Sequence, residues 1–81
     1  MKNINKWQLK KCIVAEPEEF EKIIHGFDED ATIAYDYDGI DITMDTDELY
    51  KNLAEYYGVK EVTSLHTDGY DSLLVWIVYK D

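Results

Sequence analysis

The segment between residues 31 and 45 constrains the fold more than any other part of the chain. Apolar and polar residues alternate on both sides of Asp38-Gly39, a dipeptide typical of the two-residue type I′ turn that joins antiparallel strands. We therefore predict a β-hairpin. In its predicted register, these residues face each other: Tyr37 and Ile40, Asp36 and Asp41, Tyr35 and Ile42, Ala34 and Thr43, Ile33 and Met44. The two strands then agree on which face is apolar, and a one-residue slip would destroy that agreement.

The predicted hairpin has one apolar face and one acidic face. Asp36 and Asp41 lie directly opposite each other in this register, with Asp38 at the tip. Like charges so placed destabilise a hairpin by roughly 0.2–1 kcal/mol, so folding alone gives no reason for them. The apolar face holds Ile33, Tyr35, Tyr37, Ile40, Ile42 and Met44, and the other face holds Thr32, Ala34, Asp36, Asp41, Thr43 and Asp45.

Two helices are predicted, one before the hairpin in the sequence and one after it. Pro17 followed by acidic residues is typical of a helix start, and this helix is expected to end at Gly26 or at the acidic cluster 28–30. Asp45 or Thr46 is expected to cap the second helix, and Gly58 is a natural residue just after its end. Their apolar stripes are Phe20, Ile23, Ile24 and Phe27 in the first, and Leu49, Leu53, Tyr56 and Tyr57 in the second.

The remaining segments are predicted to be strands at residues 7–15, 59–66 and 72–80, with a turn at 67–71. The last strand is apolar throughout, which is typical of a central strand or of a covered edge. The order β-α-β-β-α-β-β indicates a single α+β domain over residues 1–81, with two layers, a mainly antiparallel sheet and two helices. A right-handed crossover would make the first strand pair parallel, and a ferredoxin-like arrangement with an extra strand is one topology that fits.

The composition excludes several classes of function. A net charge of -10 argues against direct binding to nucleic acid or to an anionic membrane. No apolar run reaches the roughly 18–20 residues that a membrane span needs, and the first thirteen residues do not form a secretory signal. Cys12 is the one cysteine, so no internal disulfide can form, which is typical of the reducing cytoplasm.

The charge is distributed unevenly along the chain. Residues 1–15 carry four lysines and no acid, whereas residues 28–48 carry nine acids and no base. Carboxylates two residues apart on a strand lie roughly 6.8 Å apart, about twice the spacing of phosphates along a DNA strand. The acids therefore predict a surface for a basic partner protein, and a nucleic-acid-handling protein fits this description best. The predicted contact residues are Asp28, Glu29, Asp30, Asp36, Asp38, Asp41, Asp45, Asp47 and Glu48.

The chain resembles the small acidic nucleic-acid mimics with which phages and mobile elements inhibit host defence. The resemblance lies in size, charge and cysteine content rather than in a motif. It implies inhibition by occupying the nucleic-acid groove of the target. Two alternatives stay open: the acids serve only solubility, or the chain is a small structural or regulatory domain that forms a homodimer through its apolar C-terminal strand.

No catalytic residue, cofactor site or metal site is predicted, and we do not expect an enzyme. His25 and His66 do not form a motif with a nucleophile. A constellation of Cys12, His66 and Asp68 would require the first and fourth strands to be neighbours. Residues 34–45 only superficially resemble a calcium loop, because the first ligand position would be an alanine and the flanks alternate as strands.

Overall fold

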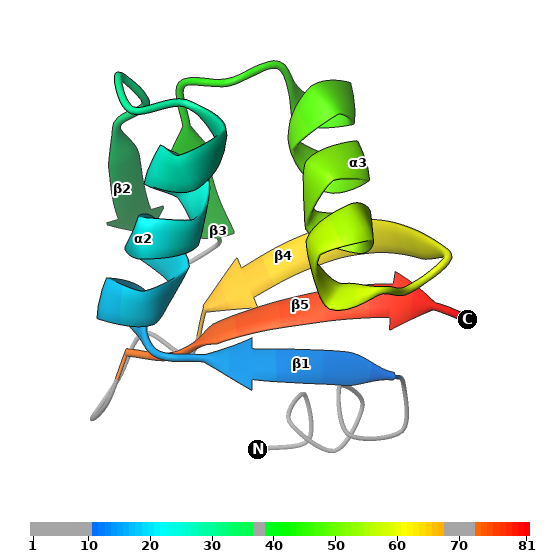
Figure 1. The fold of residues 1–81 in the computed structure, drawn as a ribbon. Helices are drawn as coiled ribbons and strands as arrows, with labels where there is room; N and C mark the ends of the chain where they lie inside the picture. Colours follow the sequence, from blue (N-terminus) through cyan, green and yellow to red (C-terminus); the bar gives the residue numbers. More distant parts are fainter. Residues whose placement is uncertain (1–10, 37–38, 68–72) are drawn as a thin grey trace.

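The computed structural model describes residues 11–36, 39–67 and 73–81 and shows an α+β fold (Figure 1). The predicted order of elements is confirmed. The elements are β1 (Cys12–Ala15), α2 (Pro17–Phe27), β2 (Ile33–Asp36), β3 (Gly39–Ile42), α3 (Thr46–Tyr57), β4 (Glu61–Thr67) and β5 (Val75–Lys80). Residues 7–10 of the predicted strand 7–15 and residues 68–71 of the predicted turn 67–71 lie outside the described residues, and Thr67 belongs to β4 rather than to the turn.

The strands divide between two antiparallel sheets rather than forming one. The larger sheet has the order β1-β5-β4, and β2 pairs with β3 in a separate hairpin. Because β2 lies in the separate hairpin and β1 pairs antiparallel with β5, the parallel pairing of the first two strands and the ferredoxin-like topology are both wrong. The physical reason for the observed order is the apolar character of β5. In the central position, β5 is paired along both edges and its inner face is covered.

The C-terminal strand is central, which is one of the two positions that its apolar sequence predicted. β5 contacts β1 along one edge and β4 along the other. It therefore has no free edge for pairing with a second copy, which argues against edge-to-edge self-association through this strand. Homodimer formation itself stays a prediction.

Both helices lie on the same side of the three-stranded sheet (Figure 1). The core is enclosed between the helices and the sheet. In α2, Phe20 and Ile24 are fully buried, as the predicted stripe requires. In α3, Leu53 is fully buried, but Tyr56 is 58% exposed, so its assignment to the apolar stripe is wrong. The core consists of Ala15, Phe20, Ile23, Ile24, Ala31, Leu49, Leu53, Ala54, Val62, Val75 and Ile77.

The ends of α3 follow the predicted capping chemistry. The Asp45 side chain accepts a hydrogen bond from the Glu48 backbone N–H at 3.1 Å, which satisfies one free donor of the first turn. Gly58 ends the helix with φ at 71°, a conformation that favours glycine. Val59 then donates its N–H to the Ala54 carbonyl at 3.0 Å and turns the chain toward β4.

The hairpin register differs from the predicted one by two residues. Asp41 faces Ala34 and Asp36 faces Gly39, so the predicted direct pairing of Asp36 with Asp41 is wrong. The observed register places a glycine opposite Asp36 and removes the direct repulsion of two carboxylates. Every described side chain stays on its predicted face, because the side-chain period of a strand is two. Asp38 lies outside the described residues, and Gly39 begins β3.

Among the described helices, none is both long enough and apolar enough to cross a bilayer.

Candidate functional site

The fold brings two acidic segments that are distant in sequence to one end of the molecule. The α2–β2 connection and the β3–α3 connection both lie at this end (Figure 1). They are joined through Thr32 and Thr43: the Thr43 N–H donates to the Thr32 carbonyl at 3.1 Å, and the Thr32 N–H donates to the Thr43 Oγ1 at 2.8 Å. We define the acidic end as Asp28, Glu29, Asp30, Asp45, Asp47 and Glu48.

Two carboxylates of the acidic end also hold its backbone in place. The Asp30 N–H donates to Asp28 Oδ1 at 3.0 Å, and Asp45 caps α3 as described above. The side chains of Glu29, Asp30, Asp47 and Glu48 are exposed and have no structural hydrogen bond among the described residues. The site thus combines fixed loops with outward-facing charge.

The outer face of the hairpin extends the acidic surface away from this end. Asp36 and Asp41 are both exposed and occupy diagonal rather than opposite positions. Diagonal neighbours in an antiparallel pair lie about 7–8 Å apart, a distance that weakens repulsion but still presents two charges together. The Asp36 carbonyl accepts a hydrogen bond from the Thr67 hydroxyl at 2.9 Å, which ties this end of the hairpin to β4.

Eight of the nine predicted contact residues thus lie on the acidic end or on the outer hairpin face, and Asp38 lies outside the described residues. Their role in binding stays a prediction.

The ion pairs of the described residues lie elsewhere. Lys11 pairs with Asp81, and Lys80 Nζ lies 3.9 Å from Glu61 Oε1. All four side chains are more than half exposed, so these pairs contribute little to stability. No described lysine pairs with the acidic end, and its negative field is therefore available to an external cation.

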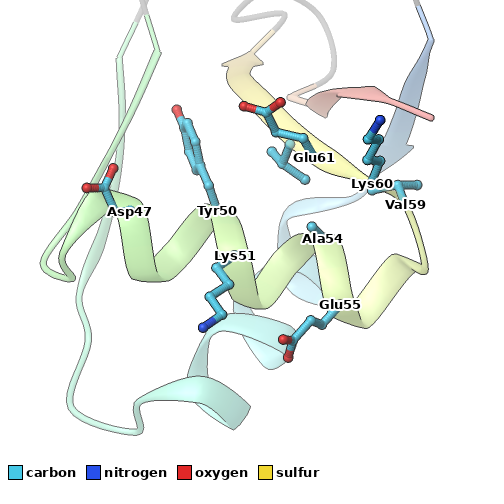
Figure 2. A pocket seen from close by; sticks show the side chains of 9 residues that line it. Asp47, Tyr50, Lys51, Ala54, Glu55, Val59, Lys60 and Glu61 are labelled. Carbon is cyan, nitrogen blue, oxygen red and sulfur yellow. The ribbon is translucent and has the colours of Figure 1, made fainter.

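A groove between α3 and the start of β4 lies next to the acidic end (Figure 2). Its volume is about 410 Å³. Asp47 belongs to both the groove and the acidic end. The groove was not predicted, although five of its residues recur at helical spacing, because that face mixes apolar and charged residues. The lining residues are Asp47, Tyr50, Lys51, Ala54, Glu55, Val59, Lys60, Glu61 and Val62.

A hydrogen bond that the sequence did not reveal links the hairpin to α2. The Tyr35 hydroxyl donates to Glu21 Oε2 at 2.9 Å in a partly buried setting. Burial raises the pKa of the Tyr35 phenol strongly, and the bond to the Glu21 carboxylate raises the pKa further. The neutral phenol is therefore favoured in the folded protein.

Replacing Tyr35 with phenylalanine is expected to flatten the loss of stability at alkaline pH. The phenol contributes stability that is complete below its unfolded-state pKa of about 10 and is lost as the pH rises toward the higher folded-state value. Urea unfolding at pH 7, 9, 10 and 11 measures this slope. Part of the slope will remain in the Tyr35→Phe variant, because burial also raises the pKa values of Tyr50 and Tyr57. Tyr56→Phe, at an exposed position, is the control, and equal slopes in wild type and Tyr35→Phe would contradict the prediction.

The described histidines and the cysteine do not come together as a reactive centre. β5 lies between β1, which carries Cys12, and β4, which carries His66, so the neighbouring strands that a Cys12/His66/Asp68 constellation requires are not formed. Burial raises the pKa of the Cys12 thiol, which disfavours the reactive thiolate. His66 Nε2 lies 3.0 Å from the Ser64 hydroxyl, and His25 Nε2 lies 3.0 Å from the Ala31 carbonyl oxygen. Asp68 lies outside the described residues.

Within the described parts of the chain, no group of three or more His, Cys, Asp or Glu side chains is arranged to hold a metal ion.

Comparison with known proteins yields no match: no family model, no curated protein and no solved structure is significantly similar to this chain.

Proposed function

We propose that this protein is a non-enzymatic acidic module that binds a basic, nucleic-acid-handling protein and inhibits it as a nucleic-acid mimic. One observation carries the proposal. The acids at 28–30 and 45–48 meet at one end of the molecule, although more than a dozen residues of hairpin separate them in the sequence. A surface that serves only solubility does not require acids to be gathered in this way.

The mechanism is electrostatic and steric. Exposed carboxylates without local counter-charges raise the rate at which a basic partner associates, and they then form charge-assisted hydrogen bonds with its arginines and lysines. The bound module covers the groove that nucleic acid would otherwise occupy. Because the Debye length is about 10 Å at 0.1 M salt, binding weakens as salt is added.

The test is capture of partners from the lysate of the native host with immobilised protein at low and moderate salt. Wild type is expected to retain a basic nucleic-acid-binding protein that added DNA or RNA displaces. Asp36→Lys/Asp41→Lys is expected to weaken this binding at least about tenfold, because it replaces two attractive charges with two repulsive ones. Circular dichroism verifies that the variant is folded.

The matched control is Glu16→Lys/Glu18→Lys, which changes the net charge equally at exposed positions outside residues 28–48 and outside the groove. It is expected to retain the partner. If both double variants bind equally well, or if nucleic acid does not compete, then the acids serve solubility and the proposal fails.

A further inference from the structure

The groove between α3 and β4 has the form of a site for one long side chain. Ala54 and Val62 close its floor, with exposed fractions of 8% and 2%, and Val59 is half-buried at the C-terminal end of the helix. The half-buried ring of Tyr50 forms a wall that rises from α3 (Figure 2). An apolar floor beside an aromatic ring suits an aliphatic stem that ends in a polar group.

The Asp47 and Glu61 carboxylates lie on the Tyr50 side of α3, and the Lys60 side chain extends to the same side beyond Glu61 (Figure 2). Tyr50 and Glu61 extend to the same side of α3, and Asp47 flanks the ring one turn earlier in the helix (Figure 2). Lys51 and Glu55 extend to the other side of the helix in this view, so their charges lie away from the ring. The pair between Glu61 and Lys80 is long, at 3.9 Å, and exposed, and therefore leaves the Glu61 carboxylate available to a ligand.

We propose that this groove receives a single arginine side chain from the basic partner. The assignment rests on the proposed function for the identity of the partner and deepens it, because it names the residue that the partner inserts. Asp47 makes the groove continuous with the acidic end. An arginine bound here would lie at the margin of the surface on which the partner rests.

Arginine fits this groove better than lysine. The planar guanidinium stacks on an aromatic face and bonds carboxylates through a rigid fork of donors, whereas the lysine ammonium is a compact and more strongly hydrated charge. Burial raises the pKa of the Tyr50 phenol, so the ring is neutral at physiological pH and its hydroxyl can donate a hydrogen bond. The stem of the arginine covers Ala54 and Val59, and its head lies between Asp47 and Glu61.

Lys60 places one positive charge at the groove. It lines the groove on the β4 side, next to Glu61 in sequence. This ammonium repels a bound guanidinium and therefore weakens, but does not remove, the attraction of the two carboxylates.

The test titrates the isolated protein with N-acetyl-arginine methylamide and follows backbone amide shifts by NMR. Shifts are expected at residues 47–54 and 59–62. The lysine analogue is expected to bind about two- to fivefold more weakly, because it lacks the stacking guanidinium. Shifts spread evenly over all acidic residues, or equal binding of the two analogues, would overturn the assignment.

Four variants separate the groove from general acidity. Tyr50→Leu keeps an apolar side chain but removes the ring, and it is expected to weaken arginine binding about two- to fivefold. Glu61→Gln is expected to weaken it about two- to threefold, and Lys60→Gln to strengthen it about twofold. Glu18→Gln, on the exposed face of α2 and outside the groove, is the matched control for Glu61→Gln and is expected to change nothing. Equal effects of the Glu18 and Glu61 variants would overturn the proposal.

The titration and the lysate capture can fail independently. If the arginine analogue binds the groove but the hairpin variant still captures the same proteins as wild type, the nucleic-acid mimic fails and the guanidinium site stands. If the capture succeeds but the analogue does not bind the groove, only the arginine site falls.

Discussion

Replacing Phe20 with alanine is expected to lower the free energy of unfolding by about 3–5 kcal/mol, the range for truncating a fully buried aromatic ring. Phe20 has no exposed surface and lies between α2 and the three-stranded sheet, where no rearrangement at the surface can fill the space it leaves. A chain of 81 residues is stable by only about 4–12 kcal/mol, and the self-repulsion of its charge works against it. The variant is therefore expected to lose a large part of its stability.

Thermal unfolding measures this loss. For a domain of this size, about 1 kcal/mol corresponds to about 4–8 °C in Tm, so the expected decrease is at least about 12 °C. Phe27→Ala, near the C-terminal end of the same helix, is the matched control. Phe27 is only half-buried and packs edge-on against Tyr56 with ring centroids 6.4 Å apart, so its truncation is expected to cost clearly less. Equal decreases in the two variants would show that Phe20 is not central to the core.

Replacing Ile77 with proline is expected to abolish cooperative unfolding altogether. Ile77 is fully buried in the central strand, opposite Ile13 on one side and Leu65 on the other. The Tyr79 N–H donates to the Lys11 carbonyl, and hydrogen-bonded pairs alternate along an antiparallel ladder, so the Ile77 N–H is the next donor to β1. Proline removes this donor and the buried side chain together.

Val14→Pro is the control that isolates the position in the sheet. Val14 lies on edge strand β1 opposite Trp76, in a pair that alternates with the hydrogen-bonded ones, and it is 46% exposed. Its N–H therefore points away from β5, and proline at this position is expected to leave the fold intact. Circular dichroism and urea unfolding show whether each variant is folded and unfolds cooperatively. A cooperative transition in Ile77→Pro would contradict the central position of β5.

Only part of the candidate site can be predicted from the sequence. The acids of residues 28–48 can be read directly from the chain, and the alternation of the hairpin places Asp36 and Asp41 on its outer face. Their mutual register cannot be read in this way, because a shift of two residues leaves every side chain on the same face. The groove beside Tyr50 is also hidden from the sequence, since its two walls come from different elements and become a groove only when α3 packs beside β4.

What the sequence determined by itself is local. Periodicity, Pro17, Asp45 and Gly58 specify the helices and the faces of the strands, because capping and alternation depend only on neighbours within a few residues. The tertiary structure alone decided that β5 lies between β1 and β4, that the acidic segments meet at one end, and that Tyr56 is exposed. These features depend on which distant surfaces bury the most apolar area together, a competition that no single segment of the chain contains.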